Sequence, residues 1–429
     1  MKQLLKFSLA IILIGALSYA FHEISLLSQR LEKIEERLGG SEKVGCNEKD
    51  TVEMVRQSVV RIVGGESEGS GFAIQNGGII LTNFHVIESE PNPKVIFPDN
   101  TFETAQVIMA DKDADLAVIK VNTDVPALRL APPHGLSAAE QVFAIGYPLG
   151  GELPGESSII RGSFSRLAKD KKNGIEYLQA NMTLIGGISG GPMVNICGEV
   201  VGVNTSGLLL GGMGIAISAD SVKEKWRKMV ESKDPLKDVR KIDFKPNESP
   251  LEAVKAFYNY LKARKLEKGF ELLSDHFVRG YSFEQWAFGY KPNLDTSIVW
   301  IKSDKKIANR INIKLATKDL IDDEIVYKFF EGYWDVRQVN GKWLLWNPRI
   351  REVKEPGEYW FLDKDFLEAM EEFEKTHDVI GKYVPEMYAL SQEPGNENLS
   401  MEELYNKAKE MIDKPDNARA AKFAVRKDL

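Results

Sequence analysis

The sequence GGISGGPMV, residues 186–194, places Ser189 between pairs of glycines. Glycine reaches backbone angles that other residues avoid, so this stretch predicts a sharp turn that presents a hydroxyl and lets a second chain approach closely. Taken by itself, the pattern fits a glycine-rich hairpin better than a catalytic site. It acquires a chemical meaning only together with two other segments of the chain.

Those two segments supply the other groups that a hydroxyl nucleophile needs. GIILTNFHVIE, residues 78–88, carries His85, and DKDADLAVIKV, residues 111–121, carries Asp115. Alone, the histidine is best interpreted as a core residue and the aspartate as a turn residue before a strand. Together with Ser189 they form a set of nucleophile, base and base-orienting carboxylate, which acyl transfer by a hydroxyl requires.

In this combination the chain resembles the trypsin-like serine proteases, particularly the bacterial HtrA (DegP-like) branch. The likeness runs from residue 69 to residue 218, in the order His, Asp, Ser. It extends to three further stretches: GSGFAI at 69–74, VFAIGYPLG at 142–150 and GMGIAISAD at 212–220.

The resemblance implies specific roles for numbered residues, and it implies neither a metal nor a cofactor. The expected catalytic triad is His85, Asp115 and Ser189, with the backbone N–H groups of Gly187 and Ser189 as the oxyanion hole. The expected substrate-binding residues are Thr183, Leu184 and Ile185, which precede the nucleophile, and Thr205, Ser206 and Gly207, whose backbone would pair with the substrate as an added strand.

Two features depart from the HtrA pattern. Ile188 stands where that branch usually has Asn and where digestive proteases have Asp, so activation by a new N-terminal ammonium has no partner here. This residue also raises the question of what fixes the oxyanion loop. No stretch after Glu231 resembles the PDZ domain that is usual in the branch, so regulation through such a domain is not expected.

The length predicts several folded regions, and the N-terminal segment predicts that they lie outside the cytoplasm. The 429 residues are too many for one ordinary domain, and the net charge of −7 comes without the basic stripe that nucleic-acid binding needs. Two lysines precede an apolar run, which predicts a signal-anchor or transmembrane segment at 1–22 and a short coiled-coil-like helix at 23–40. We expect the catalytic domain to be periplasmic or on the cell surface, or secreted if the signal is cleaved.

The rest of the sequence predicts four more parts. Many short strands divided by turn residues predict an all-β double barrel at 50–231, and a linker follows at 232–247. Residues 248–354 weakly resemble the NTF2-like (SnoaL-like) α+β cone, with an Asn340-Gly341 hairpin near the end. A charged helical tail, broken at its prolines, is expected at 355–429. Asp275 and His276 are interpreted as ordinary turn residues.

The favoured hypothesis is therefore a membrane-anchored serine endopeptidase that acts on proteins or peptides and carries an NTF2-like accessory module. A second hypothesis is a binding or sensing protein on a protease scaffold that no longer turns over, with Ile188 as its only support. A third hypothesis is an enzymatic reaction in the NTF2-like cavity, but no residue pattern in the sequence supports it. Self-association, and pairing between Cys46 and Cys197, are open from the sequence.

Overall fold

The computed structural model describes residues 46–413 apart from 66, 133–135, 149–154, 206–212, 243, 358–359, 363, 378, 380, 394 and 397–398. The predicted membrane segment at 1–22 and the predicted helix at 23–40 lie outside these residues. Within the described part of the chain, no helix is long and apolar enough to cross a membrane. Both cysteines, Cys46 and Cys197, are disulfide-bonded.

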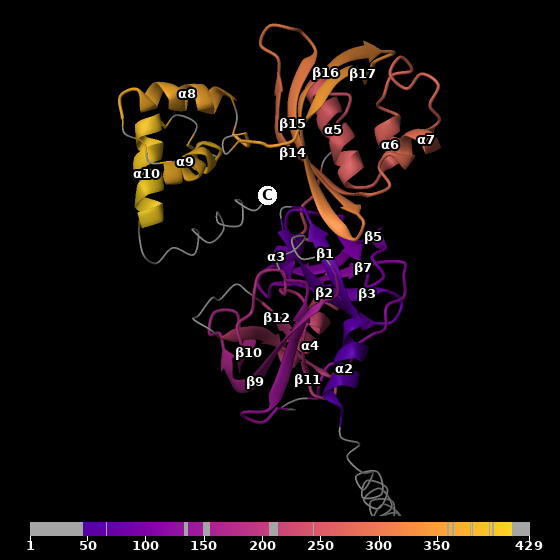
Figure 1. The fold of residues 1–429 in the computed structure, drawn as a ribbon, viewed down its shortest axis with the longest axis vertical. Helices are drawn as coiled ribbons and strands as arrows, with labels where there is room; N and C mark the ends of the chain where they lie inside the picture. The colour runs from indigo at the N-terminus through magenta and orange to yellow at the C-terminus, as the bar shows by residue number, and fades with distance from the viewer. Residues whose placement is uncertain are drawn as a thin grey trace, which may run out of the picture. The chain divides into compact units, whose positions relative to one another are not determined.

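The first β-rich region is a seven-stranded antiparallel sheet (Figure 1). Its order is β5-β4-β1-β2-β3-β7-β6, so the strands that flank the His85 and Asp115 segments, β3 and β7, are direct neighbours. The strands are β1 Val59–Gly64, β2 Ser67–Gln75, β3 Ile79–Thr82, β4 Lys94–Ile96, β5 Phe102–Thr104, β6 Gln106–Asp111 and β7 Leu116–Lys120. Most of their apolar residues are buried, which explains the short runs of Val and Ile in the sequence, whereas Phe102, Ile108 and Met109 on β5 and β6 are only partly buried.

The second β-rich region is a closed barrel in the order β10-β13-β12-β11-β8-β9. Its strands are β8 Gln141–Gly146, β9 Ser158–Lys169, β10 Glu176–Asn181, β11 Pro192–Asn195, β12 Val200–Asn204 and β13 Gly214–Ser218. The Ser189 turn connects β10 to β11. Ile188, the residue before the nucleophile, is 0% exposed and belongs to the apolar core of this barrel.

Three helices accompany these strands: α2 Glu48–Arg56, α3 Phe84–Ile87 and α4 Ala219–Val230. The segment 232–247, expected as a linker, has no helix or strand among its described residues. It does not run free, because Leu236 and Val239 pack against the core of the first sheet and Pro235 O accepts a hydrogen bond from Ala110 N at 2.9 Å.

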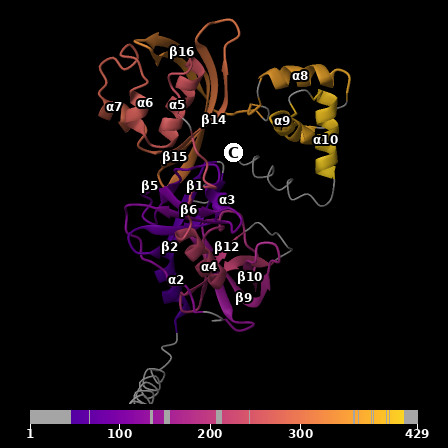
Figure 2. The same cartoon turned by 180° about the vertical axis from the view of Figure 1, so that it is seen from behind.

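The third region combines a helix layer with a four-stranded antiparallel sheet in the order β14-β15-β16-β17. Helix α5 packs on the sheet, and α6 and α7 lie beside it on the same side (Figure 1 and Figure 2). The elements are α5 Pro250–Lys262, α6 Leu266–Phe270, α7 Phe283–Phe288, β14 Asn293–Ser303, β15 Arg310–Ile321, β16 Glu324–Val339 and β17 Lys342–Val353.

Local sequence signals explain two boundaries in this region. Helix α5 begins at Pro250, a residue suited to a first helical position, and the side chain of Ser249 accepts a hydrogen bond from the N–H of Glu252. The turn between β16 and β17 has φ of 49° at Asn340 and 78° at Gly341. Both angles are positive, as the tight hairpin turn predicted from this pair requires.

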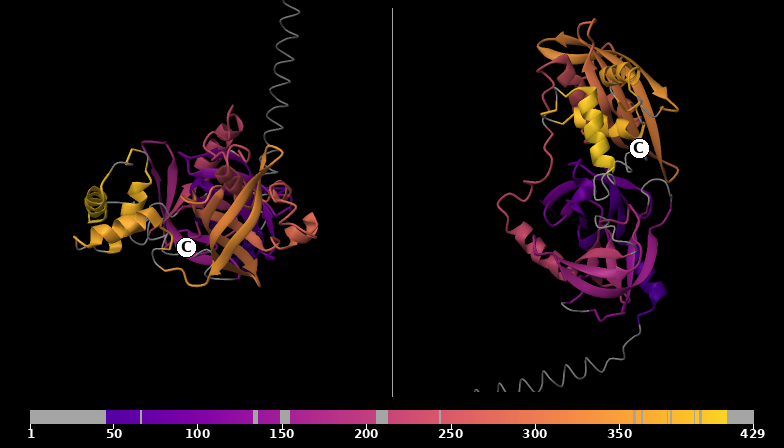
Figure 3. Two further views of the ribbon diagram at one scale, coloured as in Figure 1. Left: turned by 90° about the horizontal axis from the view of Figure 1, so that it is seen from above. Right: turned by 90° about the vertical axis from the view of Figure 1, so that its left-hand side faces the viewer.

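The C-terminal part contains the helices α8 Lys364–Glu374, η2 Gly381–Tyr383, α9 Val384–Ser391 and α10 Met401–Asp413. These helices share an apolar core, and Figure 3 shows them from two further directions. Pro385, one of the prolines expected to break a helix, lies instead in the first turn of α9. Its missing N–H costs nothing there, because that group has no partner within the helix.

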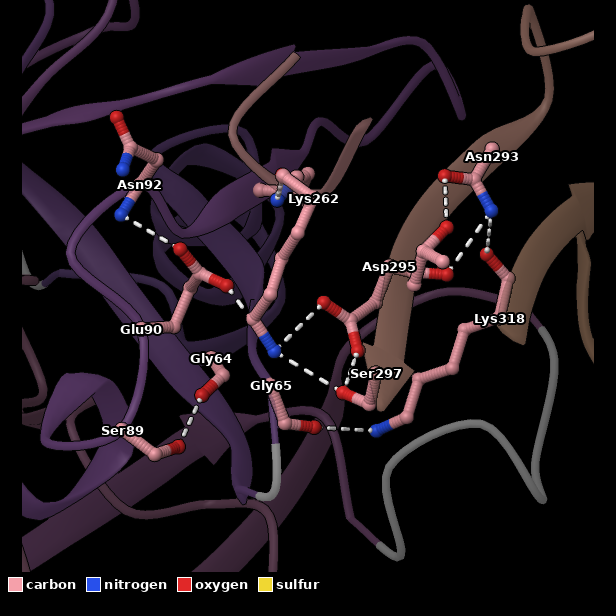
Figure 4. A network of polar contacts seen from close by, with 12 residues as sticks. Gly64, Gly65, Ser89, Glu90, Asn92, Lys262, Asn293, Asp295, Ser297 and Lys318 are labelled. Carbon is pink, nitrogen blue, oxygen red and sulfur yellow. Dashed lines mark hydrogen bonds and ion pairs between the residues drawn. The ribbon is translucent and has the colours of Figure 1, made fainter. Parts of the chain in front are cut away.

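A buried network of charged side chains connects the first sheet with the α+β region (Figure 4). The Nζ of Lys262, at the end of α5, lies 3.4 Å from Glu90 Oε2 and 3.1 Å from Asp295 Oδ1, and it donates to Ser297 Oγ at 3.0 Å. Glu90 and Asp295 are 0% and 2% exposed. Lys94 is buried with them and donates to the backbone carbonyl of Lys262.

A second group of charges continues this network. Lys318 Nζ binds Glu68 Oε1 at 2.9 Å and the backbone carbonyl of Gly65 at 2.9 Å. Tyr327 donates to the same Glu68 oxygen, and Arg61 binds the other carboxylate oxygen at 2.7 Å. The contacts fall on β2 just before Ser70 and on the turn just after α3. The α+β region is therefore anchored on the segments that lead to the candidate site.

Candidate active site

The histidine and the aspartate of the predicted triad face each other. His85 Nδ1 lies 2.9 Å from both Asp115 Oδ1 and Asp115 Oδ2. The backbone N–H of His85 also donates to Asp115 Oδ1, at 3.0 Å. The two side chains are 40% and 29% exposed, so the pair is accessible to solvent. The geometry fixes which ring nitrogen binds the carboxylate and leaves Nε2 for other partners.

The local backbone explains why this pair forms. His85 lies in α3, the short helix that directly follows β3, and Asp115 lies in the turn that precedes the neighbouring strand β7. Asp115 has φ of 53°, an angle that aspartate tolerates better than most residues. Asn83 Nδ2 donates to the backbone carbonyl of Asp115 at 2.8 Å and so connects the two segments a second time.

The carboxylate of Asp115 has a further partner that the sequence reasoning missed. Thr205 Oγ1 donates to Asp115 Oδ2 at 3.2 Å, while the backbone N–H of Thr205 binds Ile215 O at 3.0 Å. The sequence predicts Thr205 only as a backbone contact for substrate. Its hydroxyl joins the second barrel to the carboxylate that comes from the first sheet, so Thr205 helps to hold the aspartate in position.

Ser189 lies on the turn between β10 and β11 and is 3% exposed. Gly187 has φ of 90° and Gly190 has φ of 84°, both in the range that favours glycine. A Cβ at Gly190 would come within 2.2 Å of Ser70 O. The predicted sharp turn is present, and the close contact at Gly190 is with strand β2 of the same chain. The predicted close approach of a substrate stays a prediction.

The other residues predicted to bind substrate differ in how far they are exposed. Leu184 is 7% exposed and packs in the core of the second barrel, whereas Ile185 is 42% exposed. Thr183 is exposed as well. Ser206 and Gly207 lie outside the described residues. Of the predicted pocket segment, Ile185 and Thr183 are thus the side chains available at the surface.

No cluster of His, Cys, Asp and Glu residues in the described chain could hold a metal ion. The chemistry that the residues support is the transfer of an acyl group to a serine hydroxyl. Such a reaction needs a base oriented by a carboxylate and a serine on a turn that presents backbone N–H groups. His85 and Asp115 form such a pair, and Ser189 lies on a turn flanked by glycines with positive φ.

The comparisons with known proteins point to the same region. Residues 69–203 match the family model described as "Trypsin-like peptidase domain". This region is a trypsin-like peptidase domain. The resemblance to the HtrA branch is confirmed, and so is a trypsin-like all-β barrel fold for the region. Of the two predicted barrels, the second is closed, whereas the first is a seven-stranded sheet.

Curated relatives agree with this assignment. The chain is 34% identical over 163 residues to the protein named "Serine protease HTRA1" of Xenopus laevis. This alignment covers 37% of this chain and 35% of that protein. It is 38% identical over 141 residues to the "Probable periplasmic serine endoprotease DegP-like" of Hahella chejuensis, covering 33% of this chain and 30% of the relative. The matched stretch thus spans about a third of the length of these relatives.

A solved structure, "Crystal structure of Rv3671c protease, inactive form", also aligns with the chain. The alignment covers 42% of this chain and 91% of that one, with a TM-score of 0.38 and 23% sequence identity.

Proposed function

We propose that this protein is a serine endopeptidase in which Ser189 is the nucleophile, His85 the base and Asp115 the orienting carboxylate. Ser189 Oγ attacks the scissile carbonyl while His85 takes its proton, and His85 then protonates the leaving amine. Asp115 holds the imidazole with Nδ1 toward itself and stabilises the imidazolium. The N–H groups of Gly187 and Ser189 bind the oxyanion.

One observation carries this proposal. His85 Nδ1 lies 2.9 Å from the carboxylate of Asp115 inside a stretch that matches a trypsin-like peptidase domain. The relatives named as serine proteases support the same reaction class. The alternative, a binding protein that has lost turnover, rested on Ile188. That side chain is 0% exposed in an apolar core, an ordinary role that needs no loss of catalysis.

We propose further that cleavage follows small or medium aliphatic residues such as Val, Ala or Leu. The segment of Thr183, Leu184 and Ile185 contains no carboxylate, so a substrate lysine or arginine would be held there without a counter-charge, at a cost of several kcal/mol. An extra methylene is worth only about 1–3 kcal/mol in an apolar pocket, so the preference should be broad.

The surroundings of the domain belong to the proposal too. The lysines and apolar run at 1–22 support a membrane anchor with the peptidase outside the cytoplasm, or secretion if the segment is cleaved. The helix α5 packed on a four-stranded antiparallel sheet supports an NTF2-like module at residues 248–354. The buried ion network suggests that this module supports the peptidase region directly, since it contacts the turn that follows α3.

A casein-degradation assay on the full chain tests the proposed reaction. The wild type should degrade casein, whereas Ser189→Ala and His85→Ala should both be inactive with unchanged thermal unfolding. Combining the two changes should cost no more than either one, because nucleophile and base act as a unit. Casein degradation by either single variant at the wild-type rate would remove that residue from the mechanism.

A further inference from the structure

A buried serine lies directly beneath the turn that carries Ser189. Ser70 belongs to β2 and is 0% exposed. Its hydroxyl donates to the backbone carbonyl of Gly187 at 2.8 Å and accepts from the N–H of Tyr147 at 2.8 Å. Its own N–H donates to the carbonyl of Ser189 at 2.8 Å. Ser70 therefore binds both residues whose N–H groups are expected to form the oxyanion hole.

The position of Ser70 is itself fixed from several sides. Its carbonyl accepts a hydrogen bond at 2.7 Å from the side chain of Thr82, which ends the strand before the His85 segment. A Cβ at Gly146 would lie 2.6 Å from Ser70 Oγ. Glycine at that position therefore leaves just enough room for the hydroxyl. A fully bonded, closely packed hydroxyl holds one orientation, which is what a positioning residue requires.

The turn at Ser189 needs such support. The part of the turn that contains Gly187 is closed by a long hydrogen bond, 3.4 Å from Ile188 N to Ile185 O, whereas the part that follows Ser189 is closed at 3.0 Å from Gly191 N to Ile188 O. The φ of 90° at Gly187 fits the third position of a type II turn, and the orientation of the peptide groups there decides where the N–H of Gly187 points. The side chain of Ile188 has no polar atom with which to fix these peptides. The hydrogen bond from Ser70 to Gly187 O supplies a fixed point from outside the turn.

We propose that Ser70 is a positioning residue for the oxyanion hole, holding the turn of Gly187 to Ser189 in its reactive orientation. Ser70 does not touch the substrate. It acts through the Gly187 carbonyl and the Ser189 carbonyl, and it supplies the hydrogen bond for which Ile188 lacks a polar group. This proposal rests on the proposed protease function of Ser189.

The test replaces Ser70 with alanine in the full chain. Loss of one oxyanion donor costs about 10²–10³ in kcat, and a donor that is misplaced but still present should cost less. We expect Ser70→Ala to lower kcat about tenfold to a hundredfold on a fluorogenic peptide taken from a mapped casein cleavage site, with KM changed less than about twofold. Affinity for the corresponding peptide boronate, whose adduct is tetrahedral, should fall in parallel with kcat/KM.

Two further variants make the test decisive. Ser274→Ala removes another fully buried serine hydroxyl that accepts a backbone N–H, at 3.2 Å from Phe277 N, but in the α+β region. It controls for a general loss of stability and should leave kcat unchanged. Ser70→Cys keeps a weaker donor at this position, although its sulfur is larger than the oxygen that it replaces. Its kcat should also lie below that of the wild type, and thermal unfolding of both Ser70 variants is measured beside kcat to separate positioning from stability.

The outcomes separate this proposal from the protease assignment. Wild-type kcat and boronate affinity in both Ser70→Ala and Ser70→Cys would overturn the positioning role while leaving the protease function intact. An equal loss of kcat in Ser274→Ala would overturn it as well, by showing a stability effect. A wild-type protein that neither cleaves the peptide nor binds the boronate would refute the protease function itself.

Discussion

Replacing Lys262 with methionine should strongly destabilise the protein. The change keeps the apolar stem and removes the ammonium that lies between Glu90 and Asp295, which are 0% and 2% exposed. Glu90 Oε2 and Asp295 Oδ1 are buried and accept no hydrogen bond of good geometry. The positive charge of Lys262 nearby therefore offsets the cost of burying these two oxygens. Burial raises the pKa of Asp295, but the charges of Lys262 and Lys94 outweigh it and hold this pKa below its usual range.

The magnitude follows from what is left behind. Removing one partner of a buried ion pair typically costs about 3–5 kcal/mol, because the other charge stays buried. Here two carboxylates remain, and Lys94 is the cation buried with them. For domains of this size, that loss lowers the melting temperature by roughly 10 °C. Differential scanning calorimetry of the full chain measures the change.

The same helix provides a matched control. Lys255 lies in α5 and pairs with Glu252 at 2.9 Å, but the two side chains are 38% and 29% exposed. Lys255→Met should change stability by less than about 1 kcal/mol, as expected for a surface pair. Adding Asp295→Asn to Lys262→Met should restore part of the stability, since one unpaired charge disappears. Equal effects of the two lysine changes would refute the assignment of Lys262 as a buried anchor.

Three further outcomes are expected. Burial raises the pKa of Glu68, but Lys318 and Arg61 outweigh it and lower this pKa to about 2. The ionised carboxylate therefore adds about 3 kcal/mol to the free energy of unfolding above pH 4.5, and this is lost as the pH falls toward 2. Glu68→Gln should flatten the acid part of a stability-versus-pH curve. Thr205→Val removes the hydrogen bond to Asp115 and should lower kcat about fivefold to tenfold without unfolding the protein; an unchanged kcat would show that the bond is not used. Mass-spectrometric mapping of cuts in an unfolded protein should find them mainly after Val, Ala or Leu, and a majority after Lys or Arg would contradict the pocket argument.

The sequence was most informative where local chemistry decides the structure. Asn340-Gly341 predicted a hairpin, and a proline after Ser249 predicted the start of a helix, because turn and cap residues act over a few positions. Strand β9 is not among those that the sequence pattern picks out individually. Its residues alternate irregularly between partly buried and exposed, so no period of two is visible in Ser158–Lys169.

Contacts between distant residues explain the rest of what the sequence did not reveal. Ser70 and Gly187 are 117 positions apart, and Thr205 and Asp115 are 90 apart. Ser70 belongs to the stretch GSGFAI, where nothing marks a hydroxyl that will bind a carbonyl in the turn between two strands of the closed barrel. The buried ion network could not be predicted for the same reason, because in the sequence Lys262 is only the basic residue in the last turn of an amphipathic helix. Only the folded chain brings these groups together.

Labelling with a fluorophosphonate probe, followed by peptide mapping, tests the central claim most directly. The probe reacts with a serine hydroxyl only if a base activates it and an oxyanion hole receives the charge. We predict that the folded wild-type chain is labelled on Ser189, and that Ser189→Ala and His85→Ala are not labelled. A folded wild-type protein that stays unlabelled, or a label that persists in Ser189→Ala, would contradict the assignment of Ser189 as the nucleophile.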